Sequence, residues 1–191
     1  MRVSREAAAE SKARIVDAAS TMLRERGVDG ASIADIMEAA GMTHGGFYKH
    51  FGSKDELVAA AARRAFAEIS DRFDAREEMG DAAAAAYVED YLSRAHIERP
   101  GRGCPVAALG GDAARHPQAL AQTFAIGAEA LIARLSRSEK RGRKPGANRA
   151  RAIRRLMALV GTVVVARAVG AGPLRDEILA ASAELEAALA D

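Results

Sequence analysis

The stretch from Ser32 to Leu57 constrains the fold of this chain more than any other stretch, because it contains several residues that typically start or end helices. Ser32 is a favourable N-cap, and Asp35 three residues later completes a loose capping box. Apolar residues then recur at helical spacing, so one face of this short helix is predicted to be buried. Gly41 ends the helix, where glycine adopts a left-handed backbone conformation at the lowest cost.

A second short helix follows after a tight turn, with Thr43 as its expected N-cap. Phe47 and Phe51 are four residues apart and are predicted to point inward, which leaves a polar face outward. Ser53 and Glu56 form a further capping box that opens a long third helix. This order of elements is a helix-turn-helix, in which the second helix enters the DNA major groove. The outward residues are His44, Gly45, Tyr48 and Lys49.

The run AGMTHGGFYKHFGSKDEL resembles the DNA-binding signature of the tetracycline-repressor (TetR) family of bacterial transcription regulators. The resemblance covers about the first third of the chain, and the remainder is similar in length and helical pattern only. It implies a helix-turn-helix domain over residues 1–52 and a helical effector-binding and dimerisation domain over residues 53–191. Members of the family dimerise through their last two helices.

Composition favours an all-α fold of about nine helices. Hydrophobic residues make up 49% and charged residues 28% of the 191 positions, and no alternating strand pattern stands out. The single cysteine, Cys104, cannot form an internal disulfide, which favours the reducing cytoplasm. The N-terminus has no apolar signal core, and the most apolar run, residues 156–166, is shorter than the roughly 20 residues that span a bilayer. No membrane partner is therefore expected.

The remaining helices are predicted from apolar stripes and from Gly and Pro. They cover about residues 4–26, 53–76, 81–98, 105–110, 117–135, 148–169 and 173–190, with breaks at 77–81 and 112–117. The stretch 136–151 holds seven Lys or Arg residues against one Glu and is interpreted as a linker. Two interpretations of this linker remain open: a flexible solvated loop, and an additional contact with DNA or RNA.

Charge is distributed unevenly in the first sixty residues, although eight basic residues stand against nine acidic ones there. No acidic residue lies between Glu38 and Asp55, and Lys49 falls in this interval. Arg2 and Arg5 form a basic N-terminal arm, which either reaches DNA or is a solvated tail. Local sign matters more than the total for contact with phosphates.

The expected DNA-binding residues divide into those that position the protein and those that read bases. The hydroxyls of Ser32 and Thr43 can donate to phosphates at helix N-termini. By position in the family motif, Tyr48, His50 and Lys54 correspond to DNA-backbone contacts, and a structural hydrogen bond is the alternative for His50. By the same resemblance, His44, Gly45 and Lys49 correspond to base-reading positions.

The glycine pair Gly45 and Gly46 costs roughly 1–2 kcal/mol in a helix interior. Close approach of the helix backbone to DNA is one explanation for this pair. The alternative is a poorly formed helix that becomes ordered only on DNA.

An effector site is expected in the C-terminal domain, as the resemblance implies. Aromatic and apolar side chains suit an apolar or aromatic small molecule, and core packing explains each of them equally well. The expected lining residues are Phe66, Phe73, Tyr87, Tyr91, Cys104, Phe124 and Met157.

Cys104 supports a second hypothesis, a thiol-based sensor of oxidants or electrophiles on the same scaffold. It lies after Arg102 and Gly103 at the expected start of a short helix, an environment that lowers a thiol pKa. The alternative is a small buried apolar residue.

No catalytic residues, metal ligands or cofactor-binding motif are predicted. Four histidines are scattered along the chain without the spacing of a zinc site, and no phosphate-binding glycine loop is present. The sequence therefore favours a ligand-responsive repressor that binds a palindromic operator as a homodimer. A small-molecule binding protein or enzyme with a vestigial DNA-binding motif is the rival from another class.

Overall fold

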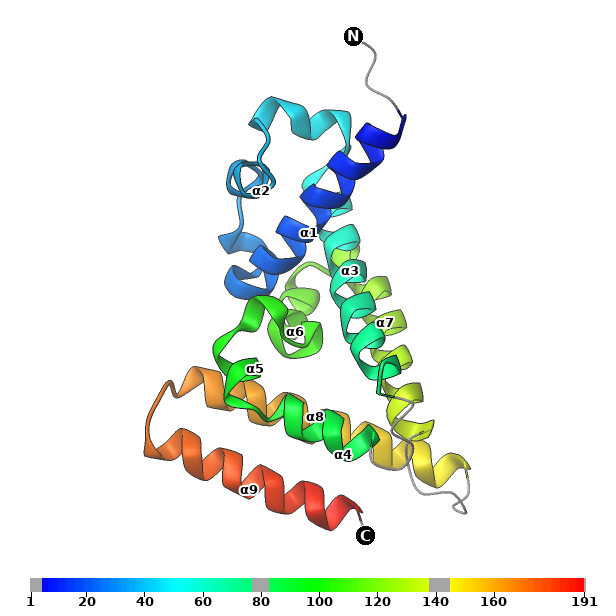
Figure 1. Cartoon of the computed structure of the whole chain (residues 1–191), viewed down its shortest axis with the longest axis vertical. Helices are drawn as coiled ribbons and strands as arrows, with labels where there is room; N and C mark the ends of the chain where they lie inside the picture. The colour runs from blue at the N-terminus through cyan, green and yellow to red at the C-terminus, as the bar shows by residue number, and fades with distance from the viewer. Residues whose placement is uncertain (1–4, 77–82, 138–144, 191) are drawn as a thin grey trace. The chain divides into compact units, whose positions relative to one another are not determined.

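The computed structural model describes residues 5–76, 83–137 and 145–190, which are helical throughout apart from short connections (Figure 1). The all-α prediction is confirmed. The elements in chain order are α1 (Arg5–Gly30), α2 (Ile33–Ala39), the 3-10 helix η1 (His44–Lys49), α3 (Lys54–Asp74), α4 (Ala83–Tyr91), α5 (Arg94–Glu98), the 3-10 helix η3 (Pro100–Arg102), α6 (Pro105–Arg115), α7 (Pro117–Arg137), α8 (Pro145–Ala168) and α9 (Pro173–Ala190).

The chain packs as two compact units, and each is built from two separate stretches. Unit 1 consists of Met1–Ala67 and Pro100–Ala125, and unit 2 consists of Glu68–Arg99 and Ile126–Asp191. Unit 1 therefore contains the predicted helix-turn-helix together with η3, α6 and the start of α7. The functional boundary between residues 52 and 53 stays a prediction.

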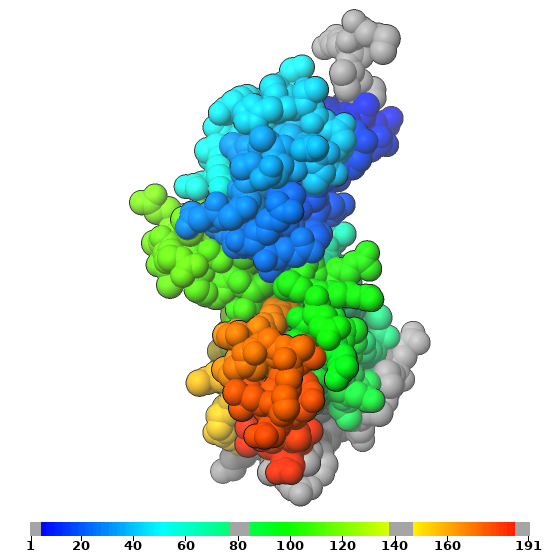
Figure 2. Space-filling model, turned by 90° about the vertical axis from the view of Figure 1, so that its left-hand side faces the viewer, coloured from blue at the N-terminus to red at the C-terminus, as the bar shows by residue number. Residues whose placement is uncertain are grey.

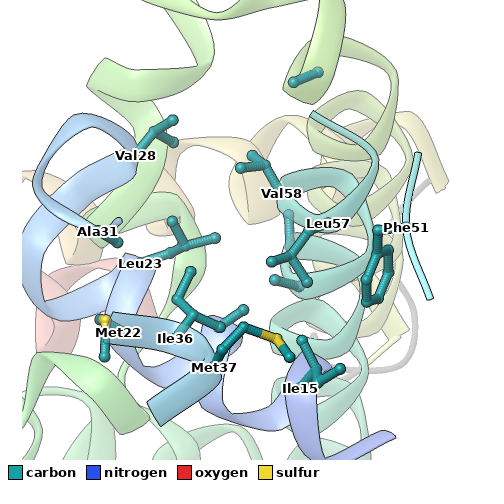
Figure 3. Packing of buried hydrophobic residues seen from close by; sticks show 14 of the residues in the cluster. Ile15, Met22, Leu23, Val28, Ala31, Ile36, Met37, Phe51, Leu57 and Val58 are labelled. Carbon is teal, nitrogen blue, oxygen red and sulfur yellow. The ribbon is translucent and has the colours of Figure 1, made fainter. Parts of the chain in front are cut away.

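The core of unit 1 joins side chains from helices that are far apart in the sequence (Figure 3). Ile15 and Leu23 of α1, Ile36 and Met37 of α2 and Leu57 of α3 are each at most 1% exposed. Burial of such a side chain contributes about 1.5–3 kcal/mol, so this cluster holds the short helices that are marginal alone. The later helices complete the cluster with Leu109 of α6 and Ala119 and Leu120 of α7.

Most of the predicted helix ends in unit 1 are confirmed. Gly27 breaks α1 with a φ of 73°, and Gly41 follows α2 with a φ of 70°. The Ser32 hydroxyl accepts the Asp35 amide at 3.1 Å, as an N-cap does. At the start of α3, the Ser53 hydroxyl accepts the Glu56 amide at 3.1 Å.

The second helix of the motif differs in type from the expected α-helix. It is a 3-10 helix, in which the Gly46 amide donates to the Thr43 carbonyl at 2.9 Å and the His50 amide to the Phe47 carbonyl at 2.9 Å. Thr43 occupies the N-cap position, but its side chain makes no capping hydrogen bond. The two adjacent glycines weaken the α-helical preference, and a short tight helix results.

Two helix boundaries in the middle of the chain were predicted wrongly. The segment expected as one helix over residues 81–98 is divided into α4 and α5, because Ser93 caps a new helix and its hydroxyl accepts the His96 amide at 3.2 Å. Helix α6 continues to Arg115 instead of ending at Gly110. Asp112, expected in a connection, is a buried helical residue whose carboxylate is paired with Arg115 at 3.0 Å.

The basic linker predicted over 136–151 is shorter at both ends. Helix α7 continues to Arg137, and α8 begins at Pro145, a residue suited to the first turn of a helix. Arg149 of α8 is paired with Glu129 of α7 at 2.6 Å, which offsets part of the repulsion between like charges. The rest of the linker, together with Arg2 and the predicted break at 77–81, lies outside the described residues.

Helices α8 and α9 lie side by side and antiparallel in unit 2 (Figure 1). The Thr162 hydroxyl donates to the Ser182 hydroxyl at 2.8 Å between them. In the single chain, residues 156–165 are not buried on all sides, because one apolar face of α8 stays open. Large apolar residues exposed on these helices and their connection are Met157, Val164, Val165, Val169, Leu174 and Leu185. Figure 2 shows the end of α8 and α9 at the surface, in orange to red.

Within the described ranges, no helix combines the length and apolar character needed to cross a membrane.

Candidate nucleic-acid interface

Phe47 and Phe51 anchor η1 in the core of unit 1. Their side chains are 0% and 1% exposed, and their rings stack with centroids 5.7 Å apart. The Phe47 ring also meets the Tyr48 ring edge to face at 5.1 Å. The inward prediction for both phenylalanines is confirmed, and these anchors determine which face of η1 is left in solvent.

The outward face of η1 carries the residues expected to meet DNA. Tyr48 is 69% exposed, and His44, Gly45 and Lys49 are exposed as well. Gly46 and His50 are half-buried at the edge of this face. An exposed cation and an exposed phenol on a helix held rigidly from behind are the groups that donate to phosphates and base edges.

Ser32 and Thr43, the two residues predicted to offer hydroxyls at helix N-termini, are both exposed. Ser32 uses an oxygen lone pair to cap α2, so its hydroxyl proton is still able to donate to a phosphate. Thr43 makes no capping bond, so its hydroxyl has both functions available.

Lys54 lies in a different setting from the one expected of a simple phosphate contact. Its ammonium group donates to the Val28 carbonyl at 2.7 Å and is partly buried. The structure therefore shows Lys54 tying the start of α3 to the end of α1.

Lys12 is a residue that the sequence did not single out. Its Nζ lies 4.7 Å from the centroid of the Phe51 ring and 3.7 Å from Glu56 Oε1. Glu56 Oε2 in turn accepts the Gly52 amide at 2.8 Å. These contacts hold the connection that follows η1, and no local sequence signal reports them because Lys12 belongs to a different helix.

The stretch of residues 100–115 packs against α1, which the sequence also did not reveal. Arg24 is 3% exposed, and its guanidinium donates to the Gly103 carbonyl at 3.1 Å and to the Ser20 hydroxyl at 3.1 Å. Gly101 lies so close to α1 that an added Cβ would be 2.8 Å from Thr21 Cγ2. Because about eighty residues separate the partners in sequence, only the folded chain brings them together.

The seven residues expected to line an effector pocket are divided between the two units. In unit 1, the Phe66 and Phe124 rings meet edge to face at 5.3 Å. In unit 2, the Phe73 and Tyr87 rings lie 4.9 Å apart. Tyr91 extends this row and has its ring centroid 5.7 Å from that of Tyr87. These mutual contacts are those of core packing, and the pocket stays a prediction.

Met157 is placed differently from a residue inside a pocket. Its side chain is 67% exposed on α8, because it lies on the open apolar face and not on the face turned toward the core. A surface cleft of about 490 Å³ does occur in unit 1, lined by residues of α1 and of the end of α2. None of the seven expected residues lines it.

Cys104 is 0% exposed at the N-cap position of α6, directly before Pro105. A thiol enclosed in this way is shielded from oxidants, so its placement supports the packing interpretation over the sensor hypothesis.

His96 is a half-buried histidine in unit 2 with a lowered pKa. Burial lowers the pKa of its ring, and the Arg167 and Arg72 charges lower it further, while the Tyr91 carbonyl and Asp90 act in the opposite direction. Since a carbonyl only accepts, the Nδ1–H of the ring donates to the Tyr91 carbonyl at 2.5 Å.

We expect this histidine to make the protein less stable toward acid. The unfolded chain, with a histidine pKa of about 6.5, takes up a proton before the folded chain does. The free energy of unfolding should therefore decrease as the pH falls below this value, and His96→Gln should flatten that slope. Urea denaturation between about pH 5 and pH 7 measures it, and His44→Gln, at an exposed position, is the control. An unchanged slope in His96→Gln would contradict the prediction.

No cluster of three or more His, Cys, Asp or Glu residues able to hold a metal ion is found among the described residues.

A buried pair of phenylalanines, a capped helix before the turn and an exposed polar helix after it define a helix-turn-helix DNA-binding domain. A family model described as "Bacterial regulatory proteins, tetR family" matches residues 15–61, which include all of these features. This part of the chain is a helix-turn-helix domain of the TetR family type, and the relatives that share it are named as transcriptional regulators.

Two relatives are similar to part of the chain. The HTH-type transcriptional regulator TtgR of Pseudomonas putida is 45% identical over 60 residues, which are 31% of this chain and 29% of that protein. The HTH-type transcriptional regulator CymR of Pseudomonas putida is 33% identical over 103 residues, 48% of this chain and 51% of that protein. The chain thus spans about half or less of the length of these relatives.

The fold of the whole chain is similar to that of a TetR transcriptional regulator from Legionella pneumophila. Its crystal structure matches 97% of this chain and 99% of that chain with a TM-score of 0.77 at 17% sequence identity. At this identity the likeness concerns the fold, and it extends over both compact units.

Proposed function

We propose that this protein is a ligand-responsive transcriptional repressor of the cytoplasm that binds a palindromic DNA operator as a homodimer. One observation carries the DNA-binding part of this proposal. The side chain of Phe47 is fully buried while the adjacent Tyr48 is 69% exposed, so η1 has one face locked in the core and one face free for a groove.

The charge and geometry of the exposed face fit DNA. Lys49 is able to donate to the O6/N7 edge of guanine, and Tyr48 and the hydroxyls of Ser32 and Thr43 to phosphate oxygens. We assign base reading to His44, Gly45 and Lys49, and backbone contact to Tyr48 and His50.

The homodimer is supported by the open apolar face of α8 and α9. Met157 and Val164 on α8 and Val169 directly after it remain solvent-exposed in the single chain. An exposed apolar face of this kind marks an interaction site, and a twofold axis allows the same two helices of a second copy to cover it. A palindromic operator follows from that symmetry.

The effector is proposed to be an apolar or aromatic small molecule bound by the C-terminal part of the chain. The proposed lining includes Phe73, Tyr87 and Tyr91 of unit 2, whose rings pack on one another in the single chain and offer apolar walls. A ligand that favours one arrangement of the two DNA-binding domains changes operator affinity by its differential affinity for the two states.

The decisive experiment is selection of bound fragments from the source genome with the purified protein, followed by footprinting. We expect a protected inverted repeat whose two half-sites lie about 10 base pairs or a multiple apart. Lys49→Ala should weaken binding to this repeat by about 1–3 kcal/mol and binding to random duplex much less. A well-folded dimer that protects no site at moderate salt would contradict the repressor proposal and support the small-molecule binding alternative.

The glycine at position 45 yields a separate prediction. An added Cβ at Gly45 meets no atom within 4 Å, and the same holds for Gly110 in α6. Both Gly→Ala variants should therefore keep the fold and raise its stability by up to about 1 kcal/mol. Only Gly45→Ala should weaken operator binding, since its methyl group would separate the η1 backbone from DNA. Parallel urea titrations and DNA-binding titrations test this, and equal DNA affinity in the two variants would contradict it.

A further inference from the structure

Val28 lies at the pivot between the first two helices of the DNA-binding domain. Gly27 breaks α1 with a φ of 73° and a ψ of 175°, so the chain changes direction directly before Val28. Four residues later Ser32 caps α2, which leads through Gly41 into η1. The orientation of the Val28 peptide groups therefore influences the direction in which α2 and η1 leave α1.

Both backbone polar groups of Val28 are bound by charged side chains from other helices. Its amide donates to Asp112 Oδ1 of α6 at 3.4 Å, and its carbonyl accepts from Lys54 Nζ of α3 at 2.7 Å. The Val28 side chain is 4% exposed and belongs to the core of unit 1. We refer to Val28 with Asp112 and Lys54 as the Val28 clamp.

The surroundings of Asp112 leave space for its carboxylate and balance its charge. Asp112 is 5% exposed, and its carboxylate also accepts from the Arg115 guanidinium at 3.0 Å, which balances the buried charge. A Cβ placed on Gly27 would lie 3.3 Å from Asp112 Oδ2, so the missing side chain of Gly27 makes room for the carboxylate. A carboxylate that accepts the first free amide after a break in a helix acts as an N-cap supplied from another element.

The Lys54 side of the clamp acts on the opposite end of the same residue. An ammonium group on a carbonyl at the end of a helix is favourable for the hydrogen bond and for the helix dipole. Because Lys54 starts α3, this bond joins α3 to the pivot that precedes α2. The helix-turn-helix is thereby attached to α1 at one defined residue.

We propose that Asp112 and Lys54 are positioning residues for DNA reading, which orient η1 through the Val28 clamp. The proposal rests on the proposed DNA-binding function. It gives Lys54 a role other than that of a phosphate contact. Helix α6 then contributes to DNA binding through Asp112, although it carries no predicted DNA contact.

Asp112 provides the sharper test because its side chain is negatively charged. Removal of an acidic side chain raises the general affinity of a protein for polyanionic DNA. We expect the reverse for the operator in Asp112→Ala: roughly tenfold weaker binding to the selected inverted repeat, with unchanged or tighter binding to random duplex of the same length. Asp112→Asn keeps the acceptor oxygen and should remain close to the unaltered protein. Equal or tighter binding of Asp112→Ala to both duplexes would overturn the proposal.

The salt dependence of binding separates the two roles of Lys54. If Lys54 contacts a phosphate, Lys54→Met should weaken binding to the operator and to random duplex alike. It should also lower the magnitude of the slope of log K against log salt by about one. The clamp predicts an unchanged slope, a loss confined to the operator, and recovery in Lys54→Arg. Loss of slope in Lys54→Met would overturn the positioning role of Lys54. If both residues act on Val28, the losses in the double variant should be smaller than the product of the single losses.

Amide hydrogen exchange of the full-length protein tests the clamp without DNA. The Val28 amide should exchange roughly tenfold faster in Asp112→Ala than in the Asp112→Asn control, while the Leu23 amide in the middle of α1 is unchanged. If no operator is found, the DNA-binding proposal fails. The exchange measurement still tests the Val28 clamp, because it uses no DNA. Equal exchange at Val28 in the two variants would overturn the clamp itself.

Discussion

Phe47→Ala is expected to destabilise the protein by about 3–5 kcal/mol, as large-to-small changes of buried aromatic residues do. Phe47 is 0% exposed, stacks on Phe51 and holds η1 against the core. Since domains of this size are stable by about 5–15 kcal/mol in total, the loss is a large fraction of the stability and should lower the urea midpoint strongly. Urea denaturation followed by circular dichroism measures the free energy, and operator binding should be lost with it.

Tyr48→Ala is the matched control for this prediction. Tyr48 is the next residue, has a similar size and is 69% exposed, so its removal should change stability by no more than about 0.5 kcal/mol. It should nevertheless weaken binding to the operator, since a phenolic donor on the exposed face is lost. A similar loss of stability in both variants would contradict the division of η1 into an anchored face and a reading face.

Val164→Glu is expected to dissociate the proposed homodimer. Val164 is 44% exposed on the apolar face of α8, and a glutamate there would place an unpaired charge in an apolar interface. We expect the dimer dissociation constant to rise by roughly a hundredfold or more, while the isolated chain stays folded because glutamate is a good helix former. Analytical ultracentrifugation over a range of protein concentrations gives the constant.

Ile126→Glu separates the effect of the interface from that of surface charge. Ile126 is 65% exposed on α7 and is not a residue of α8 or α9. It should leave the dimer constant unchanged. Should Val164→Glu remain a dimer, or should both variants dissociate equally, the assignment of the interface to α8 and α9 would be wrong.

The sequence alone determined the helix-turn-helix. Its signals are local: Ser32 and Ser53 cap helices, Gly27 and Gly41 mark helix ends, and Phe47 is the buried anchor, as the sequence predicts and the structure confirms. Such signals act within about four residues, the range over which a capping bond or a helical turn extends. The all-α class followed in the same way from periodicity.

Local signals also account for the errors. The glycine pair at 45 and 46 made a 3-10 helix of the expected α-helix, and the cap at Ser93 divided a segment whose apolar stripe looked continuous. Asp112 was expected in a connection, but it is a helical residue of α6 whose carboxylate accepts from the distant Val28 amide and from Arg115 three residues later.

What only the tertiary structure decided is which distant residues complete the DNA-binding domain. The contacts of Arg24 with Gly103, of Asp112 with Val28 and of Leu109 with the core join parts of the chain about eighty residues apart. No periodicity or cap in one segment reports a partner in another, because such contacts arise only when apolar surfaces are buried together. The sequence thus determined the elements of the helix-turn-helix, and long-range packing determined how they are held.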